Sequence, residues 1–218
     1  MDGATEAVDE MAMILTPEAK ILWETAVALS RATPAVSLPP LLFLTDPART
    51  PRPWETAARL PAGAAVIHRH FGAADAEETA RRLREATTGA GVRLLIALDA
   101  DLAEAVGADG AHLPERAVDQ AAALRARRPN WLITGTWHGG AETAAPVDAW
   151  ILSPVFPAGG ASAARAALGI ARFAALVASA RRPVYALGGI EPGNARSLIG
   201  TGACGLAGVG AIQTAFAD

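Results

Sequence analysis

The chain has 218 residues, enough for one large domain or two small ones with a sizeable buried core. Its 19 lysines and arginines against 22 aspartates and glutamates give a formal net charge of −3, which favours neither nucleic acid nor an anionic membrane as a partner. A small molecule is therefore the expected partner. The single cysteine, Cys204, lies in an apolar run and excludes a disulfide framework within one chain.

The apolar runs are shorter than the roughly 20 residues that a membrane helix needs. Residues 1–10 lack the basic start that is typical of a signal peptide. We therefore expect a cytoplasmic protein with no membrane partner.

The first forty residues contain an apolar-periodic segment over 17–29, which predicts a helix, and then the proline-rich connector ATPAVSLPP. We expect residues 1–38 to form a helical extension and linker, and 39–218 to form the main domain. The helix is expected to close the bottom of that domain or to cover a partner subunit. The sequence therefore leaves open whether the chain forms a homo-oligomer.

Short apolar runs rich in Val, Ile and Leu recur along the rest of the chain and predict β-strands. They are 41–46, 64–69, 93–98, 110–113, 131–136, 149–154, 183–187 and 205–210. Their continuous apolarity is typical of parallel strands buried on both faces. Segments with helical spacing lie between them, at 75–88, 102–107, 116–128, 170–180 and 192–202.

This alternation of eight strands with helices favours an α/β fold of the (β/α)8 type, a TIM barrel. That barrel more often takes about 250 residues. A doubly wound open sheet is the alternative.

Glycines end the last two predicted strands, Gly188 and Gly189 after the seventh and Gly208 and Gly210 after the eighth. Barrels commonly bind phosphate at these two loops, because glycine admits close backbone approach and a helix start favours an anion. The alternative is that the glycines only relieve crowding where a strand meets a helix. Their presence on both strands favours phosphate binding.

Five segments occur in a recognisable order: LLFLTD, AVGADGAHLPE, GTWH, DAWILSPVFP and ALGGIEPGNARSLIGTGACGLAGVGAI. Together they resemble the thiamine-phosphate synthase and thiazole tautomerase superfamily over about residues 40–214. The resemblance implies a (β/α)8 barrel and one of two reactions. The synthases join a pyrimidine pyrophosphate to a thiazole phosphate with magnesium, whereas the tautomerases isomerise a thiazole carboxylate phosphate without a metal.

The pyrophosphate-binding residues that the resemblance implies are incomplete. The family has a glutamine, an arginine and a lysine at alternate positions of the second strand, and this chain matches only the arginine, as Arg69, with Ile67 and Phe71 in the other places. The loop after VFP carries no lysine before Arg165. We expect one anchor for the pyrophosphate, Arg69.

The magnesium carboxylates are also depleted. Asp99 is the one that the resemblance retains after the third strand, and Ala117 stands where a second is expected, although Glu115 or Asp119 could replace it. A hard divalent ion needs several oxygen ligands. Mg²⁺ is therefore expected as a cofactor only if synthase activity is retained.

His138 follows the fifth predicted strand and matches the position of the histidine that resembles the tautomerase acid–base. Imidazole suits proton transfer between carbon atoms near neutral pH. The alternative is a hydrogen-bonded loop histidine. Trp137 beside it could stack on a heteroaromatic ring or fill the barrel mouth.

Two more histidines, His68 and His70, flank Arg69. Alternate residues of a strand share a face, so if Arg69 points into the barrel, both histidines point away from the substrate. A structural role is favoured over a metal site for them, and for His112 after the fourth strand.

These residues predict a thiamine-phosphate-synthase-like protein of thiamine metabolism that binds a phosphorylated thiazole-type ligand. Tautomerase-like isomerisation is favoured over synthase-like transfer, and a non-catalytic ligand-binding or regulatory protein is the alternative. The predicted site has His138 as the catalytic residue and Asp99 as a vestigial metal ligand. The predicted ligand-binding residues are Arg69, Trp137, Gly188, Gly189, Gly208 and Gly210.

Overall fold

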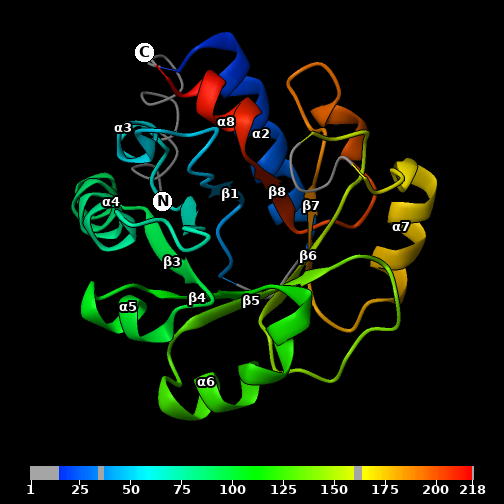
Figure 1. The fold of residues 1–218 in the computed structure, drawn as a ribbon. Helices are drawn as coiled ribbons and strands as arrows, with labels where there is room; N and C mark the ends of the chain where they lie inside the picture. Colours follow the sequence, from blue (N-terminus) through cyan, green and yellow to red (C-terminus); the bar gives the residue numbers. More distant parts are fainter. Residues whose placement is uncertain (1–14, 34–36, 160–163, 218) are drawn as a thin grey trace, which may run out of the picture.

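A computed structural model describes residues 15–33, 37–159 and 164–217. The start of the chain and the centre of the proline-rich connector lie outside the described residues. Eight parallel strands form a closed barrel in sequence order, with β8 pairing with β1 (Figure 1). The strands are β1 (Leu41–Leu44), β2 (Ala65–His68), β3 (Arg93–Ala97), β4 (Gly110–Leu113), β5 (Leu132–Trp137), β6 (Ala149–Leu152), β7 (Val184–Leu187) and β8 (Gly205–Gly208). The predicted (β/α)8 barrel is confirmed, and the open sheet is excluded.

Helices surround this barrel. They are α2 (Pro17–Ala32), α3 (Pro53–Ala57), α4 (Ala76–Ala90), α5 (Ala100–Ala105), α6 (Ala121–Arg127), α7 (Gly169–Ser179) and α8 (Gly210–Ala215), with 3-10 segments η1 (Glu115–Gln120) and η3 (Ala195–Leu198). None of the helices in the described ranges is long and apolar enough to cross a membrane.

The helix predicted over 192–202 is wrong, because only η3 forms there. Pro192 and Gly193 precede it, and Gly200 ends it with a φ of 90°. The Asn194 side chain also binds backbone groups before η3, accepting from Glu191 N at 3.0 Å. Side chains that satisfy backbone groups locally compete with helix formation.

Both faces of the strands are buried, which explains their continuous apolarity. Alternate residues such as Leu42, Ile67 and Tyr185 fill the barrel interior, whereas Phe43 and Val66 pack outward against the helices. The Tyr185 hydroxyl donates to Pro39 O at 2.6 Å inside the barrel. The core is therefore two concentric layers, as expected for this fold.

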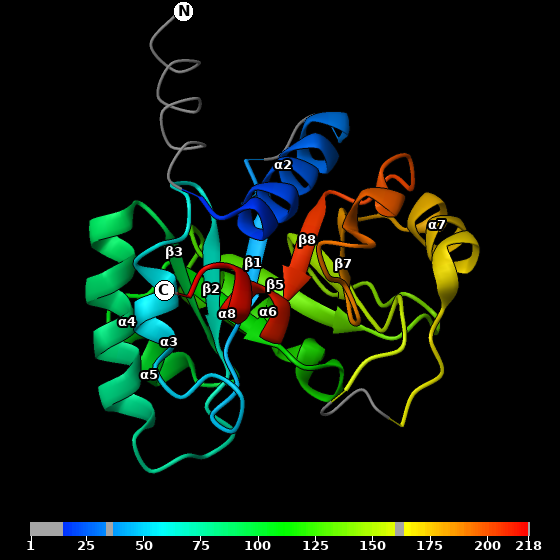
Figure 2. The ribbon, with the colours of Figure 1, turned by 90° about the horizontal axis from the view of Figure 1, so that it is seen from above.

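Helix α2 belongs to the outer ring. It packs along β8 and β1, and both views place it beside β8 (Figures 1 and 2). Thr16 at its start donates to Ala215 O at 2.9 Å, and Thr33 at its end donates to Ala203 O at 3.3 Å. The prediction that this helix closes the bottom of the barrel is wrong. It covers the barrel wall at β8 and β1, next to the six-residue helix α8.

Candidate functional site

A cavity of about 550 Å³ opens at the carboxyl end of the barrel, where the loops after β1, β6, β7 and β8 meet. Five of the predicted site residues line it together: Arg69, Gly188, Gly189, Gly208 and Gly210. Substrates of TIM barrels bind at this end of the strands. The cavity is therefore the candidate active site.

At the end of β7, Gly188 and Gly189 have φ values of 101° and 64°, which side chains rarely adopt. A Cβ on Gly188 would lie 2.7 Å from Pro154 Cα, and one on Gly189 would overlap Pro157 O. The loop after β6 therefore needs glycine at both positions. Crowding by that loop therefore explains why both residues are glycines. The backbone of both glycines also lines the cavity.

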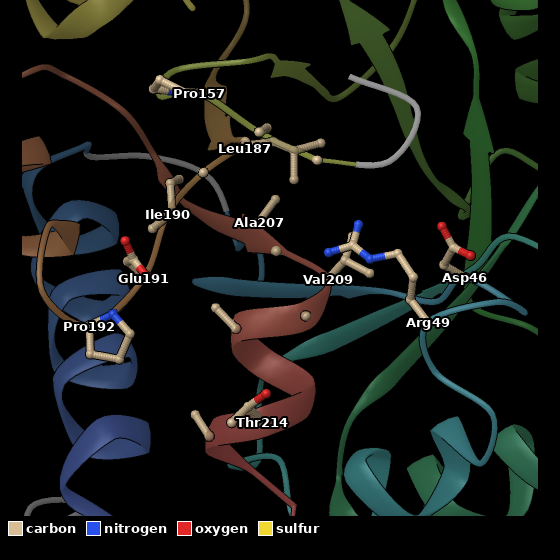
Figure 3. Close-up of a pocket in the computed structure, with 18 of the residues that line it drawn as sticks. Asp46, Arg49, Pro157, Leu187, Ile190, Glu191, Pro192, Ala207, Val209 and Thr214 are labelled. Carbon is tan, nitrogen blue, oxygen red and sulfur yellow. The ribbon is translucent and has the colours of Figure 1, made fainter. Parts of the chain in front are cut away.

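At the end of β8, the turn into α8 meets a residue that no motif in the sequence had indicated. A Cβ on Gly210 would lie 3.0 Å from Nη2 of Arg49, which comes from the loop after β1. Figure 3 shows the Arg49 side chain extending from this loop toward Val209. Asp46 of the same loop also lines the cavity. Their position directly after a barrel strand was the available signal, because β1 neighbours β8 in a closed barrel.

Arg69 follows β2 and lies on the wall of the cavity. Its Nε donates to Thr45 O at 2.8 Å, and its Cζ lies 5.4 Å from the centre of the Phe71 ring. Burial lowers the pKa of Arg69 to about 10, while the Asp46 carboxylate raises it and the Arg49 charge lowers it. Arg69 is a partly desolvated cation that faces the cavity.

His138 lies directly after β5, and its Nδ1 is 2.9 Å from Ser153 O. A carbonyl oxygen only accepts, so Nδ1 carries the hydrogen and Nε2 is the basic nitrogen of the neutral ring. The His138 backbone N also donates to Glu115 Oε1 at 3.3 Å. His138 is not among the described residues that line the cavity.

Trp137 faces away from the barrel interior. It is 5% exposed, packs in the layer between strands and helices, and its Nε1 donates to Gly140 O at 2.9 Å. Successive strand residues point to opposite faces, and Thr136 takes the inward position. This packing favours the alternative in which Trp137 fills space rather than stacking on a ligand.

Comparison with known proteins identifies the family. The family model described as thiamine monophosphate synthase matches residues 43–212. The chain belongs to the thiamine monophosphate synthase family. This membership confirms the resemblance seen in the sequence and its link to thiamine biosynthesis.

Over the aligned segments, curated relatives are about a third identical to this family member. A thiamine-phosphate synthase of Methanoculleus marisnigri is 34% identical over 164 residues, covering 71% of this chain and 78% of that protein. A thiamine-phosphate synthase of Laribacter hongkongensis is 34% identical over 63% of this chain and 67% of that protein. A Geobacter sulfurreducens protein named for the same enzyme is 37% identical, and the match spans 65% of its length.

Solved structures share the fold. The thiamine phosphate pyrophosphorylase from Pyrococcus furiosus superposes with a TM-score of 0.65 and 24% identity over 81% of this chain and 91% of that one. The tryptophan synthase α-subunit from a hyperthermophile, Pyrococcus furiosus, superposes with a TM-score of 0.52 at 13% identity, over 80% of this chain and 88% of that one. At these identities the likeness supports the barrel alone.

Of the two magnesium carboxylates that the resemblance implies, this chain retains Asp99 and has Ala117 in place of the other. Asp99 caps α5, accepting from Leu102 N at 2.8 Å, and its Oδ2 lies 3.9 Å from His70 Nε2. Ala117, at the second expected position, is buried in η1. Within the described ranges, no three His, Cys, Asp or Glu side chains lie close enough together to hold a metal ion. These residues do not fit a metal site formed by the protein alone.

His68 points outward from β2, as the alternation of strand residues predicted. Its Nε2 donates to Ala76 O at 3.2 Å, and its Nδ1 is 3.2 Å from the Thr45 hydroxyl. Burial lowers the pKa of His68 to about 4. These contacts support a structural role for this histidine.

His112 lies inside the barrel wall between two threonine hydroxyls. Its Nδ1 is 2.9 Å from Thr134 Oγ1, and its Nε2 is 3.0 Å from Thr136 Oγ1. Burial first, and the charge of Arg69 second, lower the pKa of His112 to about 3. The ring is therefore neutral near pH 7 and stays hydrogen-bonded below the site, in agreement with the predicted structural role.

Proposed function

We propose that this member of the thiamine monophosphate synthase family binds a phosphorylated thiazole-type ligand in the cavity and isomerises it without a metal ion. The observation that carries the proposal is the convergence of two arginines and two glycine turns on one cavity at the carboxyl end of the barrel. Its volume of about 550 Å³ suits a small heterocycle, since ligand sites commonly measure about 300–1,000 Å³.

The phosphate end of the ligand belongs at the β7 and β8 turns. Backbone at Gly188, Gly189, Gly208 and Gly210 faces the cavity there, and Arg69 supplies positive charge. Guanidinium groups bind phosphate oxygens through charge-assisted hydrogen bonds. An unphosphorylated analogue would lose these interactions.

Isomerisation demands less of this site than pyrophosphate transfer does. Transfer requires stabilisation of a highly charged leaving group, and each missing donor typically costs roughly 10²–10³ in rate. Arg69 and Asp99 are the remaining members of that set. Mg²⁺-dependent coupling should therefore be weak or absent.

The proton transfer is assigned to His138 Nε2, which is left basic by the Nδ1 contact with Ser153 O. It would take a proton from one carbon of the ligand and return it to another, with no change in oxidation state. Because His138 lies beyond the residues that line the cavity, the heterocycle must extend from the phosphate end toward the end of β5.

The test is to assay both reactions with purified protein, in EDTA and with added magnesium. We expect isomerisation in EDTA, little coupling under either condition, and a loss of roughly 10²–10⁴ in rate for His138→Gln. His70→Gln is the matched control and should retain isomerisation. Robust magnesium-dependent coupling would overturn the proposal and imply that Glu115, Asp119 or Arg165 replaces the missing residues.

A non-catalytic ligand-binding or regulatory protein is the second candidate. It is favoured by the position of His138 outside the described lining of the cavity. Binding of thiazole phosphate with no turnover of either kind would support this candidate over the isomerase.

A further inference from the structure

Arg49 is anchored on a loop whose shape is fixed by its own hydrogen bonds. Asp46 O accepts from Arg49 N at 2.9 Å and from Thr50 N at 2.7 Å. The buried Thr50 hydroxyl donates back to Asp46 O at 2.9 Å and accepts from Asp46 N at 2.8 Å. The base of the Arg49 side chain is therefore held in place before any ligand arrives.

The guanidinium reaches across the cavity edge to the turn between β8 and α8. A Cβ at position 210 would lie 3.0 Å from its Nη2, which is closer than an ordinary contact, so Arg49 lies directly beside this turn. Figure 3 shows this group beside Val209, and both residues line the cavity. The absence of a side chain at Gly210 thus lets Arg49 approach the β8 turn closely.

Arg49 and Arg69 are the two cationic side chains among the described residues that line the cavity. Within the described part of the chain, no hydrogen bond or ion pair occupies the Arg49 guanidinium, and Arg69 uses Nε alone, toward Thr45 O. Asp46 is the carboxylate beside them. Burial is the main reason that the pKa of Arg69 is lowered; the Asp46 carboxylate raises it and the charge of Arg49 lowers it, so both charges act on Arg69.

The other carboxylates of the cavity come from different elements. Glu18 belongs to the first turn of α2, and Glu191 follows β7. Figure 3 shows Glu191 on the opposite side of the β8 turn from Arg49. An anionic group is therefore favoured on the Arg49 side, where the two guanidinium groups of the described lining face a single carboxylate, Asp46.

We propose that Arg49 is a phosphate-binding residue of this cavity, which holds the ligand phosphate against the β8 turn and shares it with Arg69. This inference rests on the proposed binding of a phosphorylated ligand and adds the residue that selects for the phosphate. An arginine fork provides two parallel donors to phosphate oxygens. Arg49 thereby makes the cavity specific for ligands with a terminal phosphate.

The experiment is calorimetric titration of wild type, Arg49→Gln and Arg49→Lys with thiazole phosphate, with the thiazole alcohol and with inorganic phosphate. Arg49→Gln should weaken binding of thiazole phosphate by roughly 10- to 100-fold and leave binding of the alcohol unchanged. Arg49→Lys should fall between, because it keeps the charge and loses the fork.

The matched control is Arg52→Gln in the same loop, which removes one positive charge outside the cavity. Arg52 is 68% exposed and pairs with Glu55 at 2.9 Å. It should bind all three probes as wild type does. Unchanged affinity of Arg49→Gln for thiazole phosphate, or an equal loss of affinity for the phosphate and for the alcohol, overturns the proposed role of Arg49 but leaves the proposed function standing. Failure of the wild type to bind thiazole phosphate overturns the proposed function and this inference with it.

Discussion

Replacement of Arg69 by methionine should separate ligand binding from stability. Burial is the main reason that the pKa of Arg69 falls to about 10, and at about 1.4 kcal/mol per pKa unit the buried charge destabilises the fold by on the order of 3 kcal/mol. Methionine removes this destabilisation. It also removes the hydrogen bond from Nε to Thr45 O, and the unsatisfied carbonyl oxygen lowers the free energy of unfolding by roughly 1–3 kcal/mol. The two effects nearly cancel. We expect the free energy of unfolding of Arg69→Met to stay within about 2 kcal/mol of the wild type.

Affinity should respond quite differently. Arg69→Met removes a charged donor from the cavity, so the dissociation constant for thiazole phosphate should rise by roughly 10- to 100-fold. Urea denaturation measures the stability, and calorimetric titration measures the affinity. Arg52→Met is the control and should change neither. Destabilisation well above about 3 kcal/mol would show that Arg69 is a structural ion, and unchanged affinity would refute its role in binding.

Further predictions concern side chains outside the cavity. Leu22→Ala on α2 should lower the free energy of unfolding by about 2–5 kcal/mol in a single transition, because Leu22 is buried against the barrel. Lys20→Ala, at an exposed position of the same helix, should change the free energy of unfolding by less than about 0.5 kcal/mol. A small effect of Leu22→Ala would mean that α2 is an independent extension. The pKa values of His68 and His112 are lowered to about 4 and about 3, so the unfolded chain takes up protons before the folded protein does as the pH falls below 6.5. The free energy of unfolding, measured by urea denaturation, should therefore fall between pH 6.5 and pH 5 by up to about 1.4 kcal/mol per pH unit for each histidine. The fall should be less steep in His112→Gln. Equal slopes for wild type and variant would contradict the burial of a neutral His112. Trp137→Phe should keep the dissociation constant for thiazole phosphate within about twofold, and a larger loss in titration would place the indole against the ligand.

The barrel was predictable from the sequence because its strands are buried on both faces. Runs such as 41–46 and 149–154 are largely apolar, and each contains an observed strand that is buried at every position. The helix expected over 192–202 was wrong because Pro192, Gly193 and Gly200 prevent the helix that the apolar spacing of this segment predicts. The place of α2 is set by its packing against β8, β1 and α8, and no local pattern in residues 17–29 reveals these contacts.

The site was predictable where a strand fixes the direction of a side chain. Arg69 faces inward and His68 outward, as alternation along β2 required. The same alternation along β5 turns Trp137 outward, because Thr136 takes the inward position there. Arg49 could not be found from periodicity, because it sits in an irregular loop. The contact between Arg49 and the β8 turn arises only when the barrel closes.

Calorimetric titration of the wild-type protein with thiazole phosphate and with the unphosphorylated thiazole alcohol tests the central claim most directly. The cavity joins two arginines to the backbone of the β7 and β8 turns, so we predict measurable binding of the phosphate and much weaker binding of the alcohol. Equal and negligible heats for both compounds would contradict a phosphate site at this end of the barrel.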